Sequence, residues 1–262
     1  MPLDPVFWQL WWQALWPLAI FGLLGWVYSL YQRNVHIIDS MWSIYFLITA
    51  FWVAQGQILS ERSVLLLIVV VLWAARLAAY LTIRNWGKPE DYRYQQIRAN
   101  NSPHFWLKSL YIVFGLQLLL AWMIAVPLVA AVQSDAPLHW LDITGLLLSV
   151  IGIVYEGVAD WQLYRFKSDP LNRGKVLDRG LWAWSRHPNY FGEAITWWGF
   201  YLVACAAGGW WTLFSPLLMT FLLLRVSGVK LLEQTIHERR PQYRDYISRT
   251  SAFIPWPPKA RG

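Results

Sequence analysis

The sequence is poor in cysteine and in charge. Cys205 is its one cysteine, which excludes a disulfide framework and a zinc site built from several cysteines. Only 14% of the 262 residues are charged, whereas about 25% are charged in an ordinary soluble domain. No Gly-x-Gly-x-x-Gly segment occurs, so a Rossmann dinucleotide-binding half is absent. We expect no metal site.

Apolar residues are abundant instead. They make up 57% of the chain, and 20 residues are tryptophan, which excludes a disordered chain and argues against a soluble globule. About seven apolar runs are long enough to cross a bilayer as helices, which predicts an all-α integral membrane protein with a single multi-spanning domain over residues 1–262. The runs cover residues 7–30, 37–54, 63–83, 106–132, 140–163, 190–207 and 210–229.

The net charge of +7 is distributed unevenly between the two sides of the predicted membrane domain. All lysines and arginines except Arg62 and Arg76 fall on one side, in or beside the polar stretches 84–105, 164–189 and 230–262 and after the first run. The positive-inside rule then predicts an outside N-terminus and a cytoplasmic C-terminus. Topology therefore accounts for most of the charge, and we expect no nucleic-acid partner.

The third and fifth runs carry polar stripes at helical spacing. In the third run Arg76 and Arg84 share a face with Trp73 and Tyr80, and Arg76 could also snorkel to the membrane interface. The fifth run carries two carboxylates four residues apart, Glu156 and Asp160, with Tyr164 and Lys167 further along the same face. Ionisable groups inside a span need a partner. For the carboxylates this is either a structural ion pair or a hydroxyl or amide group of a ligand.

The sixth and seventh runs continue the pattern. Pro188 suits the first turn of a helix, after which Asn189, Glu193 and Trp197 share a face. Arg225 follows in the seventh run and Glu233 in its polar extension, which could also lie as a basic amphipathic helix on anionic lipid. These stripes predict a polar cavity that opens to the cytoplasm, with deeper apolar walls for a lipophilic small molecule.

The most specific motif is residues 180–193, GLWAWSRHPNYFGE. It resembles the signature of the bacterial membrane family called domain of unknown function 1295, in the steroid 5-alpha-reductase-like superfamily. Residues 73–94 and 233–256 fit the same family, so the resemblance covers most of residues 35–256. Sterol reductases and isoprenylcysteine-type methyltransferases carry related Arg-His-Pro-x-Tyr segments. The resemblance to a bacterial family implies a location in the bacterial inner membrane.

The resemblance implies a seven-helix reductase that binds NADPH from the cytoplasm and reduces a conjugated double bond of a lipophilic, steroid-like or other lipid enone. Carried over by position, Asp160 resembles the acidic cofactor contact, Asn189 the Asn near the nicotinamide amide, and Glu193 the Glu supporting that region. The other cofactor contacts that we expect are Arg76, Arg84, Glu156, Lys167, Lys175, Arg186, His187, Tyr190, Arg225, Glu233, Tyr243 and Tyr246.

The substrate side departs from the family pattern. Steroid 5-alpha reductases have a Gln-Glu pair in the second helix and a Tyr in the third. In this chain the second run has Asp39 and Trp42 instead of the pair, and Trp73 occupies the position of the Tyr. We therefore expect Tyr80 or Asp39, with Tyr94 as a further alternative, to polarise the substrate carbonyl. Trp42 and Trp73 are the expected walls of the substrate pocket.

Two other functions remain open at the level of sequence. One is an S-adenosylmethionine-dependent membrane methyltransferase of a lipid or isoprenoid, although its positively charged cofactor suits a basic site less well than the phosphates of NADPH do. The other is a non-enzymatic lipid-binding membrane protein, which would leave Asp160, Asn189 and Glu193 without a role.

Overall fold

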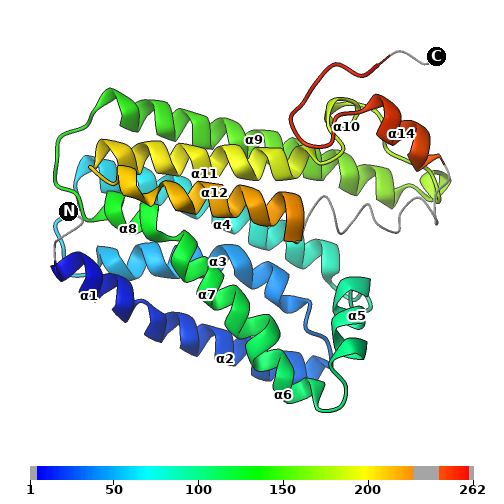
Figure 1. Ribbon diagram of the computed structural model, residues 1–262, viewed down its shortest axis with the longest axis horizontal. Coiled ribbons are helices and arrows are strands. Elements are labelled where there is room, and N and C mark those ends of the chain that lie inside the picture. Colours follow the sequence, from blue (N-terminus) through cyan, green and yellow to red (C-terminus); the bar gives the residue numbers. More distant parts are fainter. Residues whose placement is uncertain (1–4, 227–241, 260–262) are drawn as a thin grey trace. The chain divides into compact units, whose positions relative to one another are not determined.

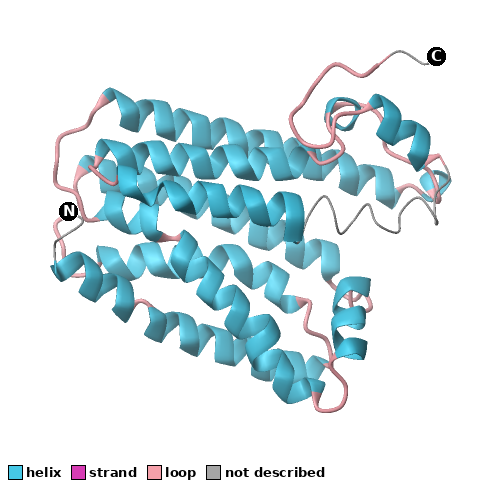
Figure 2. Ribbon diagram, viewed as in Figure 1, coloured by secondary structure: helices cyan, strands magenta, loops and turns pink. Residues whose placement is uncertain are grey.

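The computed structural model describes residues 5–226 and 242–259, and every regular element in those ranges is a helix (Figures 1 and 2). Five helical stretches are long and apolar enough to cross a membrane, and they are Pro5–Gln32, Ile37–Ala54, Glu61–Asn85, Phe105–Ile124 and Trp140–Ser168. The all-helical prediction is confirmed for these ranges, and the five stretches are compatible with an integral membrane protein. The sixth expected run is helical from Pro188 to Ala206 but is not among the five, and the seventh begins within the shorter apolar stretch Trp210–Val226. The count of seven spans stays a prediction.

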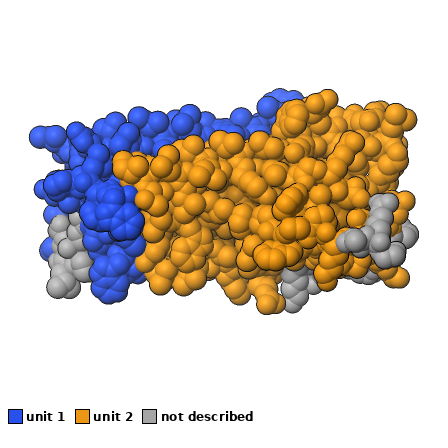
Figure 3. Space-filling view, turned by 90° about the horizontal axis from the view of Figure 1, so that it is seen from above, with its two compact units in different colours: residues 1–142, 203–212 blue, residues 143–202, 213–262 orange. Residues whose placement is uncertain are grey.

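The chain divides into two compact units, coloured separately in Figure 3. Unit 1 contains Met1–Asp142 and Val203–Thr212, and unit 2 contains Ile143–Leu202 and Leu213–Gly262. The helices of unit 1 are α1 (Pro5–Gln13), α2 (Leu15–Gln32), α3 (Ile37–Ala54), α4 (Glu61–Asn85), α5 (Tyr92–Asn100), α6 (Phe105–Ser109), the π-helical η1 (Leu110–Gly115), α7 (Leu116–Ile124) and α8 (Val126–Val132).

Two of the expected runs in unit 1 are interrupted rather than continuous, and proline explains both interruptions. The first run breaks after Gln13, because Pro17 has no N–H to donate to the Gln13 carbonyl and its ring crowds that group. The expected helix over 106–132 is wrong in its continuity. It contains the π-helical turn η1 and breaks at Ala125, where Pro127 then occupies the first turn of α8.

The interior of unit 1 is held by aromatic side chains and short hydrogen bonds between helices. Between α3 and α4, the Ser43 hydroxyl donates to the Ala74 carbonyl over 2.9 Å. Trp11 and Trp122 stack with ring centroids 4.0 Å apart. Each of these indoles also donates to the other residue's carbonyl, over 3.1 Å from Trp11 and 2.8 Å from Trp122. These contacts fix α1 against α7.

Unit 2 is built around a long helix, α9 (Trp140–Ser168), with α11 (Pro188–Ala206) running beside it (Figure 1). The beginning of α9 and the end of α11 belong to unit 1. The expected start of the sixth run at Pro188 is confirmed. The remaining elements of the chain are η2 (Pro170–Asn172), α10 (Leu181–Trp184), η3 (Trp210–Leu213), α12 (Phe214–Phe221), η4 (Leu222–Val226) and α14 (Tyr243–Arg249), of which η3 falls almost entirely in unit 1.

Glycines let α9 and α11 approach closely. A Cβ atom on Gly192 would lie 2.7 Å from the backbone nitrogen of Glu156, and one on Gly152 would lie 2.7 Å from the Gly192 carbonyl oxygen. The Ser149 hydroxyl donates to the Thr196 carbonyl over 3.1 Å along the same line of contact between α9 and α11, which we call the seam. Small residues at such spacing allow helix backbones to meet in a membrane. The close approach brings the polar stripes of α9 and α11 together.

Candidate functional site

The strongest candidate site is the polar end of the seam between α9 and α11. Glu156 and Asp160 on α9 and Glu193 on α11 are 4%, 3% and 4% exposed. Asn189, half-buried in the first turn of α11, donates from Nδ2 to Asp160 Oδ1 over 3.2 Å. The structure thus brings together Asp160 and Asn189, two of the residues that the family resemblance assigns to cofactor contacts.

The seam contains three carboxyl groups and one amide, all of which can form hydrogen bonds with a ligand. Burying a carboxyl group costs free energy unless it is paired or hydrogen-bonded. Because the Asn189 amide nitrogen is turned toward Asp160, its Oδ1 points elsewhere and can accept a hydrogen bond from another amide. The seam can therefore recognise a ligand through amide and hydroxyl groups.

The start of α11 is connected to the C-terminal tail. Arg186 Nη1 donates to the carbonyls of Thr250 over 2.6 Å and Ile247 over 3.2 Å, and its backbone N–H donates to Ser251 over 2.8 Å. In this arrangement that end of the Arg186 side chain holds the tail rather than pointing into a ligand site. His187 stacks on Tyr190 with ring centroids 5.5 Å apart.

The two expected tyrosine contacts in α14 also bind the tail to its own unit. Tyr243 and Tyr246 are 6% and 2% exposed, and the Tyr246 hydroxyl donates to the Trp182 carbonyl over 2.5 Å. The Ser185 hydroxyl likewise donates to the Phe253 carbonyl over 2.8 Å. The family resemblance pointed to both tyrosines, but only the fold shows that Tyr246 fastens the tail to Trp182.

The other expected cofactor contacts differ from the seam residues in their burial or in the unit to which they belong. Lys167, Lys175 and Arg225 are exposed, and Glu233 lies outside the residues that the structure describes. Arg76 and Arg84 are half-buried on α4 of unit 1, whereas the seam belongs to unit 2.

The two expected catalytic residues are connected through Arg84 in unit 1. The Arg84 guanidinium carbon lies 5.7 Å from the centroid of the Tyr80 ring, and its Nη2 lies 3.7 Å from Asp39 Oδ2. Asp39 also accepts a hydrogen bond of 2.6 Å from the Tyr94 hydroxyl and one of 3.4 Å from Arg93. Asp39 is therefore surrounded by donors from α4 and α5.

Tyr94 is a poor candidate for the acid. Burial, together with the charge of Asp39, raises the pKa of its hydroxyl well above the usual value. A hydroxyl with a raised pKa gives up its proton less readily, and this one already donates to Asp39. Tyr94 is better explained as the contact that docks α5 against the start of α3.

The expected substrate-pocket tryptophans also lie in unit 1. Trp73 is 0% exposed and meets the ring of Phe46 edge-on at 5.5 Å, and half-buried Trp42 meets the same ring at 5.2 Å. Trp73 is thus a core side chain in this structure, and Trp42 is the one of the two with accessible surface.

Sequence reasoning missed an open groove of about 460 Å³ beside the last two turns of α9, on a different face of the helix from its polar stripe. It is lined by Trp161, Gln162, Arg165, Phe166, Asp169, Asn172, Leu177, Arg179 and Gly180. None of the expected cofactor residues lines it. Arg165 and Arg179 had been grouped with the topology-determining cations, so no local signal distinguished them.

Comparison with known proteins gives a family and few relatives. A family model described as "Protein of unknown function (DUF1295)" matches residues 25–250. The chain is 28% identical over 272 residues to the "Uncharacterized protein C594.04c" of Schizosaccharomyces pombe, covering 90% of this chain and 77% of that protein. A stretch of 66 residues is 41% identical to the "Probable O-methyltransferase ustE" of Ustilaginoidea virens, covering 25% of this chain and 22% of that protein. No solved structure matches.

Proposed function

The chain belongs to the family described as protein of unknown function (DUF1295), and we propose that it is an NADPH-dependent membrane reductase related to the steroid 5-alpha reductases. Its substrate would be a lipophilic enone whose conjugated double bond is reduced. The observation that supports this most is the partly buried Asp160–Asn189 hydrogen bond in a seam that also holds Glu156 and Glu193.

The seam suits the carboxamide of a nicotinamide. A carboxamide offers two N–H donors and one carbonyl acceptor. The Asp160 carboxylate can accept from such a donor, and Asn189 Oδ1 can accept the other once its Nδ2 is held by Asp160. When bound, NADPH supplies the hydride, and the residues of the chain bind and orient the two reactants.

The second requirement is a group that stabilises the negative charge developing on the substrate oxygen. Tyr80 and Asp39 are the residues that we propose, with Arg84 between them. A Tyr80 hydroxyl donating to that oxygen, with the Arg84 cation close to the ring, would stabilise an enolate electrostatically. Trp42, half-buried on α3, offers an apolar surface for the hydrocarbon part of the substrate.

The distribution of charge supports an outside N-terminus and a cytoplasmic cofactor site. Of the two basic residues that depart from the expected cytoplasmic side, Arg62 is fully buried and paired with Asp142. We propose the bacterial inner membrane as the location.

A methyltransferase is the second candidate, and the partial match to a probable O-methyltransferase favours it. S-adenosylmethionine carries a sulfonium cation, which the buried carboxylates Glu156, Asp160 and Glu193 would attract. A lipid-binding protein without catalysis is the remaining alternative. It predicts that neither soluble cofactor binds.

Titration of the purified protein with NADPH and with S-adenosylmethionine tests the proposal. NADPH binding should produce energy transfer from tryptophan to the nicotinamide, and Asp160→Asn or Asn189→Ala should weaken it at least tenfold. Asp135→Asn, which alters an exposed carboxylate of unit 1, is the matched control. Binding of S-adenosylmethionine without any binding of NADPH would exclude the reductase.

A further inference from the structure

The groove at the end of α9 has an apolar floor and a rigid frame. Phe166 and Leu177, 9% and 7% exposed, form a buried cluster with Trp182. The Trp182 indole donates to the Ala159 carbonyl over 3.0 Å, and Gln162 Oε1 accepts from the Leu181 N–H over 3.0 Å. These contacts fix the 169–180 loop against α9.

The loop ends at a glycine whose backbone conformation disfavours other residues. Gly180 has a φ of +62°, which L side chains rarely adopt. A Cβ atom there would also lie 2.7 Å from the amide group of Gln162, so that side chain would have to shift. The groove is therefore a defined feature of the fold.

Two exposed arginines stand at this groove. The Arg165 guanidinium lies 5.0 Å from the centroid of the Trp161 ring, and that of Arg179 lies 6.0 Å from the ring of Phe166. Within residues 5–226 and 242–259, neither guanidinium forms an ion pair with a carboxylate. Stacking on a ring holds a cation in place without neutralising its charge.

One carboxylate, that of Asp169, also lines the groove and opposes an anion there. Its oxygens are engaged within the loop, where Oδ1 accepts from the Leu171 N–H over 2.9 Å and Oδ2 from the Asn172 side chain over 3.2 Å. Because these donors face Asp169, its charge is partly compensated, and the two guanidinium groups set the sign of the groove.

We infer that this groove binds a phosphate group carried by an organic ligand, with Arg165 and Arg179 contacting the phosphate and Phe166 and Leu177 contacting the apolar or aromatic part. Guanidinium groups match phosphate oxygens in geometry and charge. Such a ligand is either a soluble nucleotide or the headgroup of an anionic lipid. The inference does not depend on the proposed reductase activity, because none of the residues assigned to that activity lines the groove.

The test compares the double variant R165Q/R179Q with R173Q, which removes an exposed arginine of the same loop that does not line the groove. Adenosine 2′,5′-bisphosphate is the soluble probe. Nanodiscs of phosphatidylcholine with and without phosphatidylglycerol are the lipid probe, with lipid retention after repurification as the readout. A lost contact between an exposed arginine and a phosphate weakens binding by about tenfold.

Weaker nucleotide binding in R165Q/R179Q but not in R173Q supports the inference and identifies the phosphate as that of a nucleotide. Loss of phosphatidylglycerol retention with unchanged nucleotide binding supports the inference and identifies the phosphate as that of a lipid headgroup. Equal binding of both probes by the unaltered protein, R165Q/R179Q and R173Q overturns the inference. The variant R165K/R179K, which keeps both charges but not the guanidinium geometry, should bind more strongly than R165Q/R179Q. Its remaining binding would show that loss of binding in R165Q/R179Q does not come from misfolding of the groove. An effect of Asp160→Asn on NADPH that R165Q/R179Q lacks would separate this site from the seam.

Discussion

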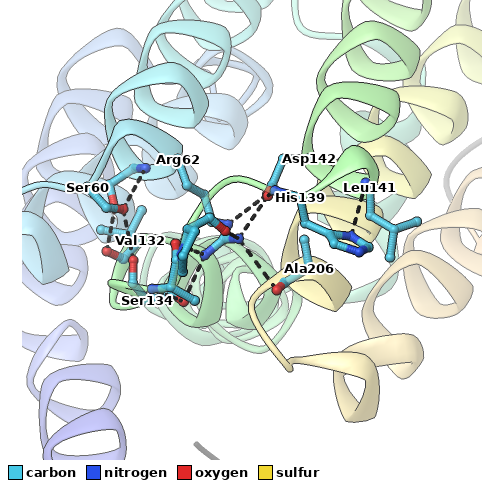
Figure 4. Close-up of polar contacts among 11 residues, drawn as sticks. Ser60, Arg62, Val132, Ser134, His139, Leu141, Asp142 and Ala206 are labelled. Carbon is cyan, nitrogen blue, oxygen red and sulfur yellow. Dashed lines mark hydrogen bonds and ion pairs between the residues drawn. The ribbon is translucent and has the colours of Figure 1, made fainter.

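Arg62 and Asp142, which are 80 residues apart in the sequence, form a fully buried two-point ion pair in unit 1 (Figure 4). Arg62 Nε lies 2.7 Å from Asp142 Oδ1, and Nη2 lies 2.8 Å from Oδ2. Arg62 also donates to the Ser134 hydroxyl over 2.9 Å and to the Pro137 carbonyl over 3.0 Å. One side chain thereby joins the start of α4, the loop after α8 and the start of α9.

Removing one member of this pair should destabilise the protein strongly. Asp142→Ala leaves the Arg62 cation buried without its carboxylate, which typically costs about 3–5 kcal/mol. Unfolding in detergent, followed by tryptophan fluorescence, measures the change. Asp135→Ala, at an exposed position in the loop after α8, is the control and should cost under about 0.5 kcal/mol. Equal losses for the two variants would show that the pair contributes nothing specific.

The close approach of α9 and α11 should not tolerate a methyl group. Gly192→Ala puts a carbon 2.7 Å from the backbone nitrogen of Glu156, which cannot move without shifting the helix. We expect a loss of about 1–3 kcal/mol in unfolding free energy and weaker binding of NADPH. Gly22→Ala, whose new carbon would meet the Tyr45 hydroxyl at 3.0 Å, should cost less because a side chain can shift. Gly192→Ala matching Gly22→Ala in both assays would argue against a tight seam.

Docking of α5 should be sensitive to acid. Burial opposes ionisation of Glu90, but its hydrogen bonds from Arg98 and from the Val35 N–H and the Arg98 charge outweigh this, so its pKa lies below the ordinary 4.5. A pKa that is lowered on folding stabilises the folded state fully above pH 4.5 and loses that contribution as the pH falls through the lowered value. The protection of the α5 amides against hydrogen exchange, taken relative to the intrinsic exchange rate at each pH, should therefore fall on acidification.

Glu90→Gln should lower the same protection already at neutral pH and flatten its dependence on pH. Some dependence should persist, because the pKa of neighbouring Asp91 is also lowered: the hydrogen bond and charge of Arg93 outweigh the opposing effect of burial. Unchanged exchange in Glu90→Gln at neutral pH would mean that the contact between Glu90 and Arg98 does not hold α5 in place.

The C-terminal tail should loosen when the Tyr246 hydroxyl is removed. Tyr246→Phe leaves the buried Trp182 carbonyl without that donor, which costs about 1 kcal/mol. Cleavage by a protease after residue 242 should then become faster, whereas Tyr164→Phe, at an exposed position, should leave it unchanged. Identical cleavage rates would assign the docking of the tail to its other contacts, such as Ser185 with Phe253.

If the proposed reductase is correct, Tyr80→Phe should lower kcat by about 10²- to 10⁴-fold, the range for loss of a proton-donating group. The phenyl ring would still lie beside Arg84, so NADPH affinity should stay within about twofold. NADPH oxidation with a test enone, followed by absorbance, gives both quantities. Tyr111→Phe, exposed on η1, is the control. Full activity in Tyr80→Phe would transfer the catalytic assignment to Asp39.

Local sequence patterns were sufficient to predict an all-helical protein with helices compatible with a membrane. Long apolar runs predict helices compatible with a membrane because hydrophobicity is a property of each segment, and Pro188 marks the start of α11 because proline fits only a first turn. The motif at residues 180–193 likewise pointed to the family whose model matches residues 25–250.

Tertiary structure decided which polar groups meet. The pairing of Arg62 with Asp142 and of Asp160 with Asn189 depends on how helices distant in the sequence lie against one another, which no local pattern encodes. The same holds for Tyr246 and Arg186, whose residue types suggest ligand contacts but whose polar atoms are used by backbone carbonyls of the fold. A buried donor is satisfied by the nearest acceptor in space, and only the folded chain determines which acceptor that is.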